Sequence, residues 1–287
     1  MSEPAGQSIA VLGSGGMLGR AVVAELVERG LEHAAIARSD VDLADPASIA
    51  GVPACDVLIN CAAWTDVDGA EAHEAEATRV NGHAIAQLLG SDRVGTLVTF
   101  GTDYVFDGRG ESPYPVDHPR NPINAYGRSK AVGEGALEAA DASRWLHVRT
   151  SWLYASWGKN FVLTMRTLMF DREELKVVDD QRGRPTSAEH LARCAIDLAL
   201  RGARGHWHAT DGGECSWYEF AREIKRLTGA PSAITPCTSD EFPRPAKRPA
   251  YSVLDIKQTE AELGPMPHWT DNLAAVLSRL PGVPAHA

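Results

Sequence analysis

The chain has 287 residues, of which 44% are hydrophobic and 23% are charged, and its formal net charge is -10 at pH 7. This length and composition predict a globular protein with a large core, either one α/β domain or such a domain with a smaller lobe. The negative charge argues against nucleic acid and against an anionic membrane as partners. The five cysteines include no Cys-x-x-Cys pair, so we expect neither a disulfide framework nor a zinc site.

The beginning of the chain carries no targeting signal that we recognise. Residues 1–8 are polar and lack an apolar signal core, and no stretch approaches the roughly 20 apolar residues that span a bilayer. These features predict a cytoplasmic protein.

A glycine-rich turn follows the first predicted strand, residues 8–12. Gly13, Gly16 and Gly19 surround the start of an apolar-periodic helix predicted over residues 17–29. Glycines let the backbone approach a pyrophosphate, and the free N–H groups at the start of a helix attract its negative charge. The pattern predicts a dinucleotide site; the alternative is a tight strand-to-helix turn without a ligand.

The first half of the chain alternates strand and helix signals. Further strands are predicted over residues 33–37, 55–60, 96–100 and 145–149, and helices over about 69–89 and around 124–130. This alternation predicts an α/β fold with a parallel sheet covered on both faces. Ligands of such sheets bind at the carboxyl ends of the strands.

The second half is less regular. Helices are predicted over residues 187–201, 216–228 and 271–279, and the proline-rich residues 231–249 predict a loop around a smaller lobe. We therefore expect a dinucleotide-binding domain over residues 1–150, to which residues 186–212 return, and a mainly substrate-binding lobe over residues 151–287.

Tyr126 and Lys130 lie four residues apart and thus on one face of a helix. A phenol with a pKa of about 10 is a poor acid or base at neutral pH, and a neighbouring ammonium group stabilises the phenolate and lowers that pKa. Such a phenol can exchange protons with a carbonyl while a cofactor moves hydride. Because the pattern also arises by chance on solvated helices, it needs support from elsewhere in the chain.

Thr102 provides that support, because it follows the fourth predicted strand, where strand ends meet the cofactor. Its hydroxyl can hydrogen-bond a substrate carbonyl, although a β-branched residue that merely ends a strand is the alternative. Thr102, Tyr126 and Lys130 together form a predicted catalytic trio.

The end of the second strand indicates which cofactor binds. A carboxylate there would bind the ribose 2′-hydroxyl of NAD, but this chain has Arg38, whose planar fork can pair with the 2′-phosphate of NADP. The sequence therefore predicts NADPH, with NADH as the alternative cofactor and a solvated loop arginine as the alternative role of Arg38. The predicted cofactor contacts are Gly13, Gly16, Met17, Leu18, Gly19, Arg38, Asp42, Leu43, Ala62, Ala63, Trp64, Thr65, Tyr126 and Lys130.

The trio and the glycine turn resemble those of the extended short-chain dehydrogenase/reductases, which act mostly on nucleotide sugars. Within that group the chain resembles the dTDP-4-dehydrorhamnose reductase family. The matching blocks are residues 60–68, 102–108, 149–152, 177–186, 216–220 and 243–249. The resemblance implies a Rossmann-type doubly wound parallel sheet with a smaller C-terminal substrate-binding lobe, and reduction of the 4-keto group of dTDP-6-deoxy-L-lyxo-4-hexulose to dTDP-L-rhamnose.

The resemblance also implies a role for each member of the trio. Tyr126 would give its proton to the C4 oxygen, Lys130 would hold the nicotinamide ribose, and Thr102 would polarise the carbonyl. The implied substrate contacts are Thr65, Val67, Thr102, Asp103, Trp152 and Arg248. Core packing is the alternative role of Trp152.

The diphosphate of a nucleotide sugar needs cations in this acidic protein. The cations available in loops of the second half are Arg182, Arg184, Arg244, Lys247 and Arg248. We expect one or two of them to bind it, and the alternative is a solvated charged surface.

The residue after Asp103 distinguishes reduction from the dehydration that related enzymes carry out. The related 4,6-dehydratases carry an Asp-Glu pair after the threonine, whereas this chain has Tyr104 in the second position, which disfavours dehydration. A 4-epimerase with the same trio stays open. So do a reductase of another dTDP-4-keto-6-deoxyhexose from secondary metabolism and a non-catalytic subunit like the β subunit of methionine adenosyltransferase, although the complete trio argues against the last.

The sequence gives little indication of a metal-binding site. His206 and His208 share one face of a predicted strand without a third ligand nearby in sequence, so strand packing explains them better. Some members of the family dimerise through magnesium held by a glutamate of the first helix, and the matching residue here is Ala21. The resemblance therefore implies a monomer or a weak homodimer and disfavours a metal-bridged dimer. Asp66 and Gly69, where the family tends to have alanine and lysine, leave the sugar open.

Overall fold

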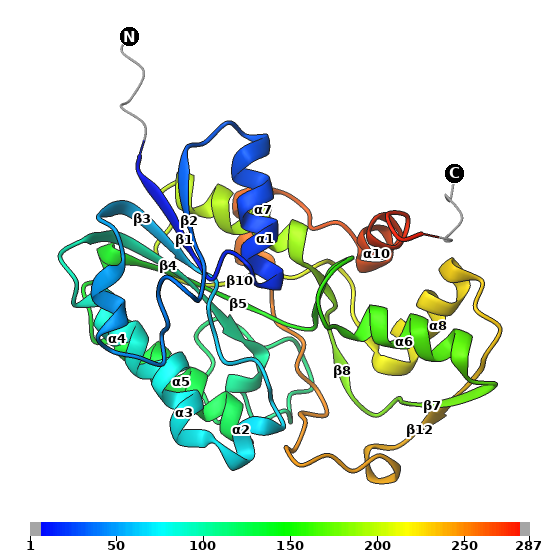
Figure 1. Ribbon diagram of the computed structural model, residues 1–287. Helices are drawn as coiled ribbons and strands as arrows, with labels where there is room; N and C mark the ends of the chain where they lie inside the picture. The colour runs from blue at the N-terminus through cyan, green and yellow to red at the C-terminus, as the bar shows by residue number, and fades with distance from the viewer. Residues whose placement is uncertain (1–6, 282–287) are drawn as a thin grey trace.

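The computed structural model describes residues 7–281, so most of the polar start on which the cytoplasmic prediction rests lies outside the described residues. A six-stranded parallel sheet forms the centre of the larger lobe (Figure 1), in the order β10-β5-β4-β3-β1-β2. Its strands are β1 (Ile9–Leu12), β2 (His33–Ile36), β3 (Cys55–Asn60), β4 (Val94–Thr102), β5 (Trp145–Thr150) and β10 (Gly205–His208). The chain moves outward from β1 to β2 and then returns past β1 to β3, which makes the sheet doubly wound.

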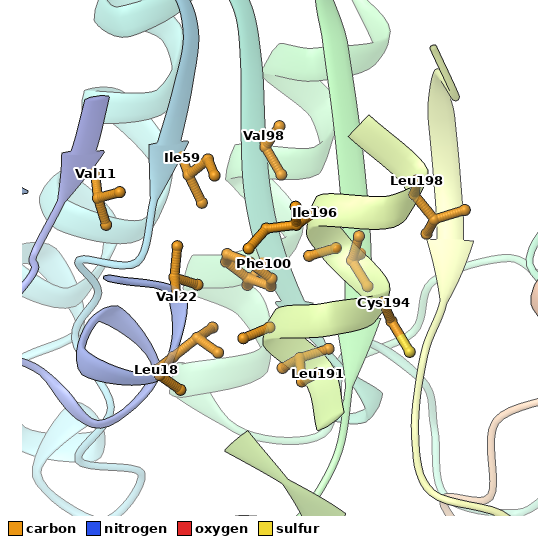
Figure 2. Close-up of a cluster of buried hydrophobic side chains, with 14 of the residues drawn as sticks. Val11, Leu18, Val22, Ile59, Val98, Phe100, Leu191, Cys194, Ile196 and Leu198 are labelled. Carbon is orange, nitrogen blue, oxygen red and sulfur yellow. The ribbon is translucent and has the colours of Figure 1, made fainter. Parts of the chain in front are cut away.

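Helices cover both faces of this sheet. One face carries α1 (Met17–Glu28) and α7 (Ala188–Leu200), and the other carries α4 (Ala84–Leu89) and α5 (Ala125–Glu138). Consecutive strand residues point to opposite faces, so Val11 packs toward α1 and α7 while Leu12 packs toward α4 and α5. Figure 2 shows the first of these two cores, in which strand residues such as Val11 meet helix residues such as Val22.

The single helix expected over residues 69–89 is interrupted in the structure. It is divided into α2 (Gly69–Ala72), α3 (Glu74–Thr78), a π-helical turn (Arg79–His83) and α4. The chain leaves helical geometry at His73, where φ is -131° and ψ is 41°. Tertiary packing explains the π turn, because the Asn81 side chain hydrogen-bonds both backbone groups of Trp64 and the hydroxyl of Ser129 on α5.

A smaller lobe is built from the second half of the chain. It contains α6 (Phe161–Asp171), β7 (Glu174–Val178), α8 (Trp217–Thr228), β12 (Ala233–Cys237) and α10 (Trp269–Leu277). A separate core lies between them, with Tyr154, Val162, Phe220 and Leu273 fully buried. Short elements join the lobes: β6 (Leu153–Tyr154) pairs with β9 (Thr186–Ser187), β8 (Arg182–Gly183) pairs with β11 (Cys215–Ser216), and α9 (Lys257–Leu263) follows.

The expectation of a continuous loop over residues 231–249 is wrong in its first part. β12 runs parallel to β7 and includes Pro236. Proline is accepted in a strand whose N–H faces away from a partner, and β12 pairs with β7 alone in its two-stranded sheet. A short 3₁₀ turn follows at Ser239–Glu241.

The segment around residues 188–208 lies with the larger lobe. Helix α7 packs on α1, and β10 extends the central sheet next to β5. Within residues 7–281, no helix is both long and apolar enough to cross a membrane.

Candidate active site

A cleft of about 650 Å³ lies at the carboxyl ends of the central strands. It falls where a doubly wound sheet places its ligands. The predicted site residues that line it are Gly13, Gly16, Met17, Leu18, Arg38, Asp42, Leu43, Ala62, Ala63, Thr65, Val67, Thr102, Asp103, Tyr126, Lys130 and Trp152. Residues predicted to bind the cofactor and residues predicted to bind the substrate thus share one cavity.

Three predicted site residues are placed elsewhere. Gly19 lies behind the glycine turn, where a Cβ atom would collide with the carbonyl oxygen of Gly13. Trp64 donates its indole N–H to the carbonyl of Asp66 at 2.8 Å. The guanidinium of Arg248 pairs with Asp68 at 2.9 Å instead of lining the cleft.

The glycine turn leaves a helix N-terminus open toward the cleft. Gly13 has a φ of 75°, and a Cβ atom there would come within 2.7 Å of the Ala62 backbone nitrogen, so glycine is required. Helix α1 then begins after Gly16, and no described side chain caps it. The N–H groups of its first turn, together with the positive end of the helix dipole, suit a phosphate or diphosphate.

Arg38 lies at the edge of this part of the cleft. Its guanidinium is 82% exposed and 3.2 Å from a carboxylate oxygen of Asp42. A hydrogen bond from the backbone of Ala44, followed by the contact with Arg38, lowers the pKa of Asp42. Most of the guanidinium stays accessible to an anion entering the cleft.

The predicted catalytic trio is brought together by β4 and α5. Thr102 is the last residue of β4 and is buried. Asn124 caps α5 by accepting a hydrogen bond from the Gly127 N–H at 2.8 Å, which fixes the first turn, with Tyr126, and the next, with Lys130. Gly127 has a packing role that the sequence did not reveal, because a Cβ atom there would collide with the carbonyl oxygen of Tyr104, in the 3₁₀ turn Asp103–Val105 that follows β4.

The surroundings of Tyr126 favour its protonated form. Burial raises its pKa, the negative charge of Asp103 raises it further, and hydrogen bonding from Thr102 opposes both. Burial also lowers the pKa of Lys130 to about 8, against the effect of Glu134, and its ammonium group donates to the Phe100 carbonyl at 3.2 Å. The expectation that Lys130 lowers the pKa of Tyr126 is therefore not met in this structure.

Asp103 is a second unusual acid in the cleft. It is 2% exposed, and burial raises its pKa to about 7. Thr102 donates its hydroxyl to one oxygen of the Asp103 carboxylate at 3.0 Å and accepts from the Tyr104 N–H at 3.2 Å. A buried carboxylate whose pKa is shifted in this way is typical of a functional cleft.

The basic residues predicted for the diphosphate lie outside the cleft. Arg182 pairs with two glutamates, Arg244 and Arg248 pair with Asp68, and neither Arg184 nor Lys247 lines the cavity. Lys159, which no sequence pattern indicates, is exposed and lines the cleft next to the start of α1. Its neighbour Gly158 lies close to the Met17 side chain, which explains the placement and could not be read from local sequence.

Other lining residues were also missed. They include Gly15, Ser151, Leu153 and Trp217. Trp217 comes from α8 in the smaller lobe, so its position depends on how the two lobes pack. No sequence pattern near Trp217 connects it with the glycine turn.

One cluster in the described structure has the donor atoms of a metal site. Side-chain ligand atoms of Glu134, His147 and His206 lie within 4.8 Å of one another, so His206 does have acidic and imidazole neighbours from distant elements. However, Arg149 donates to both oxygens of Glu134, at 2.9 and 2.8 Å, and Arg120 donates to one of them at 3.0 Å. Two guanidinium groups already neutralise this carboxylate, which makes the cluster unsuitable for a metal cation.

The doubly wound sheet, the glycine turn and the Thr-Tyr-Lys trio at one cleft define a nucleotide-dependent oxidoreductase of the Rossmann class. Among such proteins, the chain belongs to the RmlD substrate binding domain family, whose model matches residues 7–281.

Named relatives agree with this assignment. The chain is 43% identical over 274 residues to a dTDP-4-keto-6-deoxy-D-glucose reductase from Streptomyces niveus, covering 92% of this chain and 94% of the relative. It is 40% identical over 287 residues to a dTDP-4-dehydrorhamnose reductase from Streptomyces griseus, covering 94% of each. The solved dTDP-4-dehydrorhamnose reductase from Bacillus anthracis in complex with NADP has a TM-score of 0.89 at 30% identity, over 96% of this chain and all of that one.

Proposed function

We propose that the protein is an NADPH-dependent reductase that converts dTDP-6-deoxy-L-lyxo-4-hexulose to dTDP-L-rhamnose. The observation that carries this proposal is the presence of Thr102, Tyr126 and Lys130 in one cleft with the glycine turn. The names of the Streptomyces griseus and Bacillus anthracis relatives support the substrate, and the bound NADP of the latter supports the cofactor.

The trio supplies the proton side of the reaction. The cofactor, when bound, would deliver hydride to the C4 carbon. Tyr126 would donate its phenolic proton to the C4 oxygen, and Thr102 would turn its hydroxyl from Asp103 to donate to the same oxygen. Lys130 would hold the nicotinamide ribose.

The described residues fit a dinucleotide phosphate. The open N-terminus of α1 suits the diphosphate, and Lys159 is a cation beside it. Arg38 is exposed enough to pair with a 2′-phosphate. These residues would set the preference for NADPH over NADH.

We further assign residues 1–150, with 186–212, to cofactor binding and most of residues 151–287 to substrate binding. The separate buried core of the smaller lobe supports this division. With a nucleotide sugar as substrate, the protein would act in the cytoplasm as a monomer or a weak homodimer.

A second candidate substrate is favoured by the Streptomyces niveus relative, which is named for dTDP-4-keto-6-deoxy-D-glucose. That sugar differs from the proposed substrate in its configuration at C3 and C5, which a 3,5-epimerase inverts. A reductase of this kind would use the same trio, because the 4-keto group is common to both sugars.

One assay separates the two candidates. NADPH absorbance is followed with dTDP-4-keto-6-deoxy-D-glucose, with and without its 3,5-epimerase. The proposed function predicts loss of absorbance only when the epimerase is present. Equal loss without the epimerase would assign the second substrate, and no loss in either reaction would reject both.

A further inference from the structure

Trp152 has a strained backbone at the edge of the cleft. Its φ is 47°, and in the described part of the chain it is the residue other than glycine with a positive φ. A bulky side chain in the left-handed region is costly, and such strain persists only where the surrounding structure enforces it. Trp152 also lines the cleft, so the strained residue faces the candidate site.

The side chain of Trp217 explains how the Trp152 indole is held. The two indole rings stack with their centroids 3.5 Å apart and their planes 8° from parallel. The Trp152 ring also packs on Gly183, where a Cβ atom would lie 2.5 Å from the indole. The strand pair β8–β11 sets Gly183 opposite Cys215, two residues before Trp217, so one local structure provides both contacts.

Trp217 is itself fixed by the smaller lobe. It is the first residue of α8 and lies inside the capping box formed by Ser216 and Glu219. Its indole N–H donates to the side-chain oxygen of Gln181 at 3.2 Å, and its ring lies 4.5 Å from that of Phe161. The ring that supports Trp152 is therefore immobilised at its edge and along one side.

Strand register places Trp152 near the reacting end of the cleft. Thr102 of β4 is paired with Thr150 of β5. Adjacent strands are roughly 4.8 Å apart, so Thr150 lies beside Thr102. Trp152 follows Thr150 by only two residues. The adenine end of a dinucleotide would lie at β2, on the other side of β1.

We propose that Trp217 is a positioning residue, which holds the Trp152 indole against the hexose ring of the nucleotide-sugar substrate. Trp217 covers one face of the Trp152 ring and Gly183 also lies against the ring, so the remaining edge of the indole would meet the sugar, whereas NADPH would occupy the other part of the cleft. This inference rests on the proposed function. It names Trp217 as the residue of the smaller lobe that positions Trp152 for the sugar.

The test is a double-mutant cycle with Trp217→Leu and Trp152→Ala. Trp217→Leu should raise the KM for the sugar nucleotide by about five- to tenfold, the scale of one lost aromatic contact, with little change in kcat or in the KM for NADPH. In the Trp152→Ala background, Trp217→Leu should have no further effect. Trp217→Phe, which retains an aromatic ring, should restore part of the affinity and serves if the leucine variant does not fold.

Trp207→Phe is the matched control, because Trp207 lies on β10 and does not line the cleft. Circular dichroism of the ligand-free protein reports the stack itself, since the exciton signal of two stacked indoles should disappear in either single variant. An unchanged sugar KM in folded Trp217→Leu, or an equal effect of that substitution in the Trp152→Ala background, would overturn the inference. Absence of turnover by the wild-type protein would instead reject the proposed function.

Discussion

At the scale of single residues, burial in the cleft and the charge of Asp103 both raise the pKa of Tyr126, so its phenol stays protonated. A protonated phenol is the form needed by a group that donates to a developing alkoxide. Its partner in the trio, Lys130, is bound to the Phe100 carbonyl and does not offset this effect. This protonation state fits the role of proton donor that we propose for Tyr126.

The Tyr126→Phe variant tests the proton donor. We expect kcat to fall by about 10²- to 10⁴-fold, the usual contribution of a general acid, with the Kd for NADPH nearly unchanged. Steady-state kinetics and a fluorescence titration with NADPH measure the two quantities. Tyr104→Phe is the matched control, because it removes a phenol whose ring centroid is only 6.0 Å away, and it should retain most of the wild-type rate. Comparable losses in both variants would remove the special role of Tyr126.

Asp103 should give the stability of the protein a distinctive pH dependence. Its pKa rises from the ordinary value of 3.8 to about 7 on folding, so the folded chain binds its proton more tightly than the unfolded chain does. The stabilising contribution of that proton is complete below about pH 4 and is lost as the pH rises through 7. Asp103→Asn should therefore gain stability relative to the wild type between pH 4 and 7, as measured by urea unfolding.

Asp107→Asn is the control of opposite sign. A hydrogen bond from Tyr114 lowers the pKa of Asp107, so its contribution is present at neutral pH and lost on acidification. This variant should lose stability relative to the wild type at neutral pH and approach it in acid. A difference between Asp103→Asn and the wild type that stays constant from pH 4 to 8 would contradict the account of Asp103.

At the scale of elements, the start of α5 determines where Tyr126 lies. Asn124 caps the helix through Gly127 and also donates to the Lys247 carbonyl at 2.9 Å. Asn160 caps α6 of the smaller lobe in the same way, through the N–H of Leu163 at 3.1 Å. Among the described residues, Asn124 and Asn160 thus cap helices in the two lobes, and only Asn124 lies next to the predicted trio.

Alanine substitution of each cap separates stability from catalysis. Asn124→Ala should reduce the free energy of unfolding by about 1 kcal/mol, within the range of about 0.5–2 kcal/mol known for such caps. Asn160→Ala should reduce it by at least as much, because the Asn160 amide also donates to the carbonyls of Ala155 and Trp157. Only Asn124→Ala should also reduce kcat, because it releases the turn that carries Tyr126. Chemical denaturation and steady-state kinetics provide the comparison, and equal kcat values for the two variants would show that the cap does not position the trio.

Elements with a strong local signal were predicted well from the sequence. The turn between β1 and α1 and the helix with Tyr126 and Lys130 each carry their own glycine or spacing pattern. The elements that were missed depend on distant partners: Asn81 shapes the π turn by binding Ser129, 48 residues away, and β12 exists because it pairs with β7. Lys159 and Trp217 reach the cleft because of how the lobes pack, and local sequence patterns do not predict that packing.

At the scale of the whole molecule, residues of both lobes line the cleft. The trio and the glycine turn come from β1, α1, β4 and α5, whereas Trp217 comes from α8. In a protein of net charge -10, Arg38, Lys130 and Lys159 bring three cationic side chains to this cleft, beside the carboxyl groups of Asp42 and Asp103. That arrangement suits two anionic ligands, a dinucleotide and a nucleotide sugar, held side by side.

The most direct measurement follows the hydride itself. The protein is incubated with the sugar nucleotide, its 3,5-epimerase and NADPH that carries deuterium at the transferable C4 position of the nicotinamide, and the product is examined by NMR. The proposed function predicts dTDP-L-rhamnose with deuterium at C4 of the sugar. A product without deuterium at that carbon, or a sugar with a different configuration at C4, would contradict it.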